Sequence, residues 1–517
     1  MKITSKEVSW WQIYLYVVIV YIMSHGLMLL LYGAWWDDML LWNVPDKDLE
    51  LFMGPSNFNN PFIYFIVSSI NRIGDTEIMN FVFRLVPFVC WFISVSSFFL
   101  INKIITNNRA FTLYSSLICA SCGLNKCMML ISCYHYSISI SLFMIGLVCF
   151  VYDYYKDTIW YRLLNALAWT LSLLVWRSAV LVVPALVIIA CIGKTKFRWN
   201  STDSYAMIIK YAICKYWMLI LGLVTFTGLY LTILAPQGTY AGYYSVDLRN
   251  MILSPITTVL SSLSLFLGYT SNLFSIFATY NTFNIVYIII LISLFSIFLS
   301  NFSFKMDLAH RNEILMVACL FLLFSMMPHL LREFVCSYDI NGYKSRVAAL
   351  AVFPLSMIMA YFIFVFKNSI ARSLVCSIFI ILSFSFSINT YLDYEKGWMK
   401  NEAITVFFKD NNYLKGKNIA FFDNSRSYSP FINEEYRYYD YEGCSKRAYG
   451  KNDKTKCSEY ESLINFKRFE SIDYYIIINE NQHYNNIGLK SLFYRFYNSN
   501  KRDEMKKQML SFIIQKW

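Results

Sequence analysis

The feature that most constrains this chain is its first apolar segment, which runs from Trp10 to Tyr32 without an Asp, Glu, Lys or Arg. A helix of about 20 apolar residues is long enough to cross a bilayer. The segment exceeds the core of a signal peptide, which has about 7–15 residues, and shows no small-residue cleavage pattern. We therefore expect it to be retained as a membrane-spanning helix.

Similar apolar segments recur along the chain, and composition agrees with them. Hydrophobic residues make up 57% of the 517 residues, charged residues only 15%, and the mean hydropathy is +0.44, whereas soluble domains carry about 25% charged residues. The sequence predicts a polytopic α-helical membrane protein with about eleven transmembrane helices. The predicted spans are 10–32, 79–101, 110–126, 134–151, 160–176, 178–193, 211–234, 284–302, 313–329, 347–366 and 371–388.

Basic residues set the predicted orientation. They occupy successive short breaks between the apolar segments, and Lys and Arg gather in cytoplasmic loops. This distribution accounts for the formal charge of +12 without nucleic acid as a partner. The basic residues of these breaks are Lys2, Lys6, Lys103, Arg109, Lys156, Arg162, Lys194, Lys196, Arg198, Lys210, Lys305, Arg311, Lys367 and Arg372. We expect a multi-pass protein of a bacterial inner membrane, with a cytoplasmic N-terminus and a periplasmic C-terminus.

The segment from Pro255 to Thr279 is apolar but dense in Ser, Thr, Tyr and Asn. Counting it as a span places Lys305 and Arg311 outside, against the positive-inside bias. We interpret it as an interfacial or re-entrant helix packed against other helices. A full crossing remains the alternative.

The chain changes character after residue 388. We divide it into a transmembrane domain, 1–388, with a long first periplasmic loop at 33–78, and a small C-terminal periplasmic α/β domain, 389–517. Asn418–Phe422 and Asp473–Ile478 have the pattern of buried strands, with a loop-like region from Asn424 to about Glu461 between them. The stretch from Lys501 to Trp517 has the pattern of an amphipathic helix. The domain either shapes an acceptor site or only caps the membrane part.

The thirteen cysteines contain no Cys-x-x-Cys pair set with His at zinc-finger spacing, so a structural metal is not expected. Cys444 and Cys457 lie in the tail that is predicted to be periplasmic. There they can form a disulfide, because that compartment is oxidising.

Two adjacent carboxylates, Asp37 and Asp38, directly follow the first apolar segment. Charged groups at the end of a membrane span are costly unless they face water, protein or a ligand, so an acidic pair there indicates a functional site. A purely structural role in hydrating the loop fits the same placement. Both aspartates are candidate catalytic residues, and the sequence leaves open which one points inward.

The first loop returns to the membrane through a fixed series of local signals. Asn60-Pro61 predicts an extended residue followed by a new helix. Gly74-Asp75 ends that helix, and Asp75 can cap the next one. Arg84 lies near the start of that next helix. We expect Arg84 to pair with Asp75 or Glu77.

In this order the signals resemble the GT-C family of membrane glycosyltransferases, which use a polyprenyl-phosphate-linked sugar. The matching residues are Asp37-Asp38, Asn60-Pro61, Gly74-Asp75 and Arg84. Tyr343-Lys-Ser-Arg346, before an apolar span containing Pro354, is similar to the Arg-bearing entry of a late helix in that family. The resemblance covers about the first 190 residues and this late segment.

The resemblance implies a GT-C-like fold and an inverting hexosyltransferase. Size, span number and the outer tail look most like the serotype-converting glucosyltransferases that decorate the O-antigen of lipopolysaccharide. The implied donor is an undecaprenyl-phosphate-linked sugar, glucose by this likeness, and the acceptor is a lipid-linked glycan. A separate donor synthase and a separate donor flippase are implied as further partners, beside membrane lipids.

In this reaction Asp37 or Asp38 accepts the proton of the acceptor hydroxyl as general base. The leaving lipid phosphate needs cations at the outer membrane edge. The predicted topology places four there, although each can equally be a flanking residue that reaches the interface. These candidates are Arg177, Arg332, Lys344 and Arg346.

The chain also departs from the family pattern. The second outer loop of many members carries another acidic residue, but residues 125–135 contain none. No metal ligand or cofactor is therefore proposed, and the metal requirement stays open.

Two other functions remain alternatives. An O-antigen polymerase also works outside on lipid-linked glycan, through arginines. A lipid-linked glycan flippase or transporter is expected to show an inverted repeat. No phosphate loop of the Gly-x-x-x-x-Gly-Lys-Ser/Thr type is present, which excludes ATP-driven transport by this chain alone.

Overall fold

The structure is a computed structural model that describes part of the chain. The described residues are 8–42, 44, 46–54, 60–175, 217, 221, 224, 228, 248–279, 282–302, 311–330, 343–431, 436–459, 471–481 and 487–516. The predicted span 178–193 lies outside these residues, and so does 211–234 apart from its isolated described positions.

Long apolar helices dominate the described residues. Four are long and apolar enough to cross a membrane: Trp10–Leu30, Thr76–Thr106, Ile131–Asp153 and Ser369–Asp410. They contain α1 (Trp10–His25) with η1 (Gly26–Leu30), α4 (Thr76–Thr106), α6 (Tyr134–Lys156) and α15 (Ser369–Asp410). The protein is therefore a helical membrane protein.

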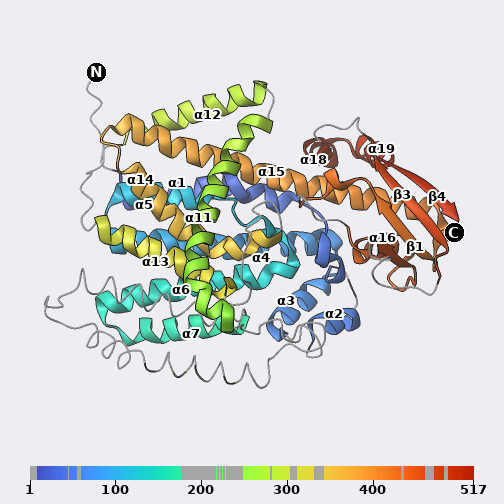
Figure 1. The fold of residues 1–517 in the computed structure, drawn as a ribbon, viewed down its shortest axis with the longest axis horizontal. Helices are drawn as coiled ribbons and strands as arrows, with labels where there is room; N and C mark the ends of the chain where they lie inside the picture. Colours follow the sequence, from blue (N-terminus) through green and yellow to red (C-terminus); the bar gives the residue numbers. More distant parts are fainter. Residues whose placement is uncertain are drawn as a thin grey trace.

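Further helices pack around these four (Figure 1). They are α2 (Asp46–Met53), α3 (Pro61–Asn71), α5 (Arg109–Ser121), α7 (Ile159–Val175), α11 (Leu248–Thr279), α12 (Thr282–Ser300), α13 (Arg311–Leu330), the 3₁₀ helix η7 (Tyr343–Ala351) and α14 (Val352–Ile363). Helices thus occupy each predicted span that falls within the described residues.

Local capping explains where the first helices begin. Asn60 accepts a hydrogen bond from the Ile63 backbone N–H, and Pro61 opens α3 as predicted. The Asp75 side chain accepts hydrogen bonds from the backbone N–H groups of Glu77 and Ile78, so it caps α4 as expected. These caps satisfy N–H groups that have no partner in the first turn of a helix.

The Pro255–Thr279 segment is helical and belongs to the continuous 32-residue helix α11. It packs against α13 and α15, which agrees with the expectation of a helix held by other helices. In Figure 1, α11 runs across the direction of α4, α6 and α15 rather than along it.

Helix α15 contains 42 residues and continues through the predicted domain boundary at 388/389. At 1.5 Å per residue it is ~63 Å long, about twice the hydrocarbon thickness of a bilayer. Its second half leads directly to the C-terminal sheet (Figure 1).

That sheet has four strands in the order β2-β1-β3-β4. Its strands are β1 (Asn418–Asp423), β2 (Lys456–Glu459), β3 (Tyr474–Glu480) and β4 (Leu510–Lys516). Strand β1 is parallel to β2 and β3, and β4 is antiparallel to β3. The two predicted strands are confirmed as the central neighbours β1 and β3.

Three details of the tail differ from the prediction. The region expected to be loop-like contains α16 (Tyr438–Tyr449) and β2. The stretch from Lys501 is not one helix, because α19 (Ser499–Gln508) ends before β4, which pairs along the whole of β3. Cys444 and Cys457 are buried thiols, and no disulfide joins them. Helix α18 (Ile487–Tyr497) precedes α19.

Candidate functional site

Asp38 lies in the 3₁₀ helix η2 (Trp36–Leu40), and its side chain is fully buried. Its two carboxylate oxygens accept hydrogen bonds from the backbone N–H groups of Ile131, at 2.9 Å, and Ser132, at 2.8 Å. These N–H groups open the short helix η4 (Ile131–Cys133), which leads into α6. A carboxylate is favoured there because the first N–H groups of a helix lack internal partners.

Burial nevertheless dominates the titration of Asp38. Loss of water contact raises its pKa from 3.8 to about 7, although the Ser132 and Ile131 N–H groups and the Arg84 charge act in the opposite direction. Desolvation disfavours the charged form of a carboxyl group. Asp38 therefore exchanges a proton near neutral pH, which suits a general base.

Arg84 of α4 joins the two segments that meet at Asp38. Its fully buried guanidinium donates to the carbonyl oxygen of Met129 at 2.6 Å and to that of Gly33, and it lies 4.5 Å from the centre of the Trp35 ring. Arg84 thus connects the chain after α1 to the chain between α5 and α6.

The expected pairing of Arg84 with Asp75 or Glu77 is wrong. Asp75 is engaged in capping α4, and Glu77 pairs instead with Arg495 at 3.0 Å. The carbonyl groups that Arg84 does contact are backbone atoms, so no side-chain pattern reports them.

Helix α15 forms the third wall of the site. Trp35 donates its indole N–H to the Tyr394 carbonyl at 2.8 Å, and the Tyr394 hydroxyl donates to the Lys126 carbonyl at 2.8 Å. Gly33 is required at its position, since its φ is +112° and an added Cβ would lie 2.1 Å from the Trp398 ring. The loop after α1 is therefore fitted closely to α15.

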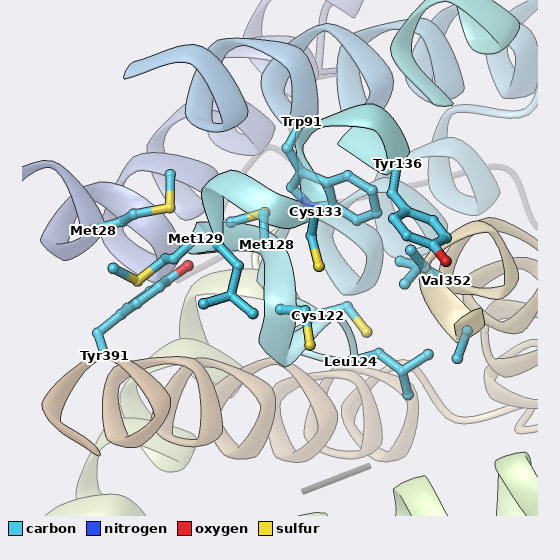
Figure 2. Close-up of a cluster of buried hydrophobic side chains, with 14 of the residues drawn as sticks. Met28, Trp91, Cys122, Leu124, Met128, Met129, Cys133, Tyr136, Val352 and Tyr391 are labelled. Carbon is cyan, nitrogen blue, oxygen red and sulfur yellow. The ribbon is translucent and has the colours of Figure 1, made fainter. Parts of the chain in front are cut away.

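The 122–133 segment between α5 and α6 contains no α-helix; it consists of the short 3₁₀ helices η3 (Lys126–Met129) and η4 joined by irregular backbone. Figure 2 shows it between Trp91 of α4 and Tyr391 of α15. Irregular backbone beside membrane helices is tolerated where protein surrounds it or a cavity adjoins it. Both conditions hold for this segment.

A small cavity lies beside the 122–133 segment. About 10 Å³ is open to the centre of a water molecule, which is room for about one water. Two of its buried lining atoms, Trp91 Nε1 and Asn125 Oδ1, have no hydrogen-bond partner among the described residues. Lys126 also lines it, and its buried ammonium lies 3.5 Å from Asp393. A buried cation of the segment between α5 and α6 therefore adjoins this cavity.

Arg346 belongs to η7, which contacts η3 of the 122–133 segment. Its guanidinium carbon lies 5.9 Å from the centre of the Tyr136 ring. The adjacent Ser345 hydroxyl is 3.6 Å from the Cys127 sulfur. Cys133 lies within electrostatic reach of both Asp38 and Arg346, so these two predicted site residues gather around one loop.

The other predicted site residues fall outside the described part of the chain. This holds for Arg177 and Arg332 entirely and for the side chains of Asp37 and Lys344. Among the residues that the structure describes, no group of three or more His, Cys, Asp or Glu side chains is placed to hold a metal ion.

Sequence reasoning missed Lys126, Tyr394 and the aromatic residues of α15 as parts of the site. Lys126 ends a predicted apolar span, and that charge in an apolar context was the available signal. Tyr394 and Trp398 carried no such signal, because tyrosine and tryptophan are common near membrane surfaces.

The fold and this arrangement define a helical membrane protein with a buried carboxyl group at the junction of three long helices. No family model and no curated protein sequence matches the chain. Among solved structures, it is similar to the crystal structure of ArnT from Cupriavidus metallidurans bound to undecaprenyl phosphate. The identity is 9%, the TM-score is 0.31, and the match covers 92% of this chain and 94% of that one. At that TM-score the likeness carries no argument about this chain.

Proposed function

We propose that this protein is a membrane glycosyltransferase of the GT-C type, which moves a sugar from a polyprenyl phosphate to a glycan. The observation that carries the proposal is Asp38, a buried carboxyl group with a pKa of about 7 directly after the first span. The ordered motifs from Asp37 to Arg84, with Arg346 further along, support it.

In the proposed reaction, the oxygen of an acceptor hydroxyl attacks the anomeric carbon of the donor sugar. The new carbon–oxygen bond forms as the bond from that carbon to the lipid phosphate breaks, with inversion. Asp38 accepts the hydroxyl proton, and the lipid phosphate leaves with the bonding electron pair. A positioned base contributes about 10²–10⁴-fold in rate.

Asp38 is fully buried, and the Ile131 and Ser132 N–H groups bind its carboxylate. The proposed reaction therefore needs a local rearrangement that lets the acceptor hydroxyl reach Asp38. Arg346, with Arg177, Arg332 and Lys344 as further candidates, would then stabilise charge on the leaving phosphate. Glucose as the sugar and O-antigen as the acceptor are the finer parts of the proposal and rest on the family resemblance alone.

The test is sugar transfer in membranes supplied with a polyprenyl-phosphate sugar. Asp38→Asn should lower the rate by about 10²–10⁴-fold, because an amide cannot take up the proton. Asp46→Asn is the matched control, since Asp46 lies in the same loop and bonds only Ser68 and Arg72 in the described residues. Asp37→Asn tests the second carboxylate.

Rate against pH separates catalysis from folding. A base with a pKa of about 7 makes transfer rise with pH through neutrality in the parent protein. Undiminished transfer by both the Asp37 and Asp38 variants would refute the proposed base. A parent that transfers no sugar from any such donor would favour a polymerase or a transporter.

A further inference from the structure

Helix α18 turns its large apolar side chains away from the protein. Leu489, Phe493 and Phe496 follow a helical spacing and lie on one face. They are exposed by 57%, 55% and 56%. The opposite face, with Ile487, Gly488, Ser491 and Leu492, is buried. A helix at the surface of a water-soluble domain turns a polar face outward instead.

The buried face of α18 is firmly docked on α15. A Cβ added to Gly488 would lie 2.2 Å from the Leu392 carbonyl oxygen, so the two backbones are in close contact. The Ser491 hydroxyl donates to Glu395 at 2.5 Å, and Arg502 of α19 bonds the same carboxylate at 3.1 Å. The outward direction of the apolar face is therefore fixed.

Independent contacts place α18 at one boundary of the membrane. Arg495 donates to the Leu30 carbonyl at 3.1 Å and to Glu77 at 3.0 Å. Leu30 ends the first span and Glu77 is the second residue of the next one. Along α15, Leu392 lies ~35 Å from the first residue of the helix, slightly more than the ~30 Å hydrocarbon thickness.

We propose that α18 lies in the membrane interface, with Leu489, Phe493 and Phe496 inserted among phospholipid chains. Tyr497 and Lys490, both exposed beside this face, are residue types that favour the headgroup level. The partner is the bilayer surface itself, and α18 holds the C-terminal sheet against it.

Neighbouring helices support a lipid-facing position. Helices α12 and α18 both contact α15 and lie on the same side of it in Figure 1. Helix α12, a predicted span, exposes Val286, Ile290 and Leu294. The apolar face of α18 thus continues the apolar surface of the membrane part. This proposal does not depend on the chain being a glycosyltransferase.

Photo-crosslinking of the full-length protein in phosphatidylethanolamine and phosphatidylglycerol nanodiscs tests this placement. Phe493 is replaced by p-benzoylphenylalanine, which inserts into nearby C–H bonds on illumination. Tyr413 is the matched control, because it is an aromatic residue exposed by 52% that lies ~30 Å beyond Leu392 in the direction of α15. Both substitutions replace one exposed aromatic side chain by another, and gel filtration checks that the variants remain folded.

Mass spectrometry should find phospholipid attached at position 493 and none above background at 413. A second variant with the label at Phe496 should behave like the first. Position 493 without a lipid adduct would overturn the proposal. Attachment to a second copy of the chain would overturn it as well, since α18 would then be a dimer contact.

Discussion

Two aspartates with little contact to solvent, the buried Asp38 beside the membrane helices and the partly buried Asp423 at the end of β1, differ in what surrounds them. The backbone N–H groups of Ile131 and Ser132 hold Asp38. Asp423 instead contacts the buried Lys400 ammonium at 2.6 Å. Burial thus has opposite outcomes at the two positions.

The pKa of each group follows from these contacts. Burial raises the pKa of Asp38 to about 7. At Asp423 burial acts in the same direction, but the Lys400 charge and hydrogen bonds from Lys400 and Ser425 bring the pKa below its usual value. A cation in direct contact makes a buried carboxylate permanently charged and structural, whereas backbone donors alone leave it able to exchange a proton. Of these two aspartates, Asp38 is the one suited to acid–base chemistry at neutral pH.

The largest expected effect comes from removing the Lys400 cation, whose direct contact distinguishes Asp423 from Asp38. Lys400→Met removes the cation and leaves a buried carboxylate, which should cost about 3–5 kcal/mol of folding free energy. Hydrogen exchange at β1 amides measures the loss. Lys396→Met is the control on the same helix. The Lys396 ammonium lies 5.8 Å from the centre of the Tyr428 ring and forms no ion pair among the described residues. Equal protection in both variants would contradict the structural role of the ion pair.

A smaller change trims the contacts of Asp423 without removing its cation. The Tyr441 hydroxyl donates to Asp423 at 2.9 Å. Tyr441→Phe keeps the ring stacked on Phe421 and should destabilise the sheet by about 1.5–3 kcal/mol, the usual worth of a hydrogen bond to a charged group. Chemical denaturation monitored at the C-terminal unit gives the number, and no change would mean that water replaces the hydroxyl.

At the Asp38 site, Arg84→Lys separates charge from geometry. Lysine keeps the positive charge but cannot reach both the Gly33 and Met129 carbonyl groups, so one buried acceptor loses its donor at about 1–3 kcal/mol. The pH profile of sugar transfer should shift little while thermal stability falls. A large alkaline or acid shift with unchanged stability would show that Arg84 acts mainly through its charge.

The last prediction concerns how Asp38 makes folding stability depend on pH. Because its pKa is raised on folding, Asp38 favours the folded state at acid pH, and this contribution is lost as pH rises from about 4 to about 7. The loss is about 1.4 kcal/mol per pH unit, and the slope ends above neutrality. Asp38→Asn should abolish this part of the stability–pH curve. An identical curve for the variant would show that Asp38 does not titrate in this range.

Sequence reasoning succeeded where one local cause decides the structure. The first span follows from the run Trp10–Tyr32, the start of α4 from the cap Asp75, and β1 from the apolar residues Asn418–Phe422. Each of these needs only hydropathy or a single hydrogen bond.

Sequence reasoning failed where a distant partner decides the outcome. The apolar residues of Leu510–Lys516 fit a helix or a strand, and pairing with β3 selects the strand. Helix α16 lacks an apolar repeat because tyrosines and charges fill it, yet it packs on α15 and η2. Arg84 binds backbone carbonyl groups, which a side-chain pattern cannot identify.

The uninterrupted length of α15 has a mechanical consequence. This one continuous helix carries Tyr391 beside the cavity, Trp398 against Gly33, and Lys400 in contact with Asp423 of the C-terminal sheet. A tilt of about 5° at Tyr391 would move the end of the helix at Asp410, ~28 Å further along, by about 2–3 Å. A displacement of α15 beside the cavity would in this way reach the C-terminal sheet.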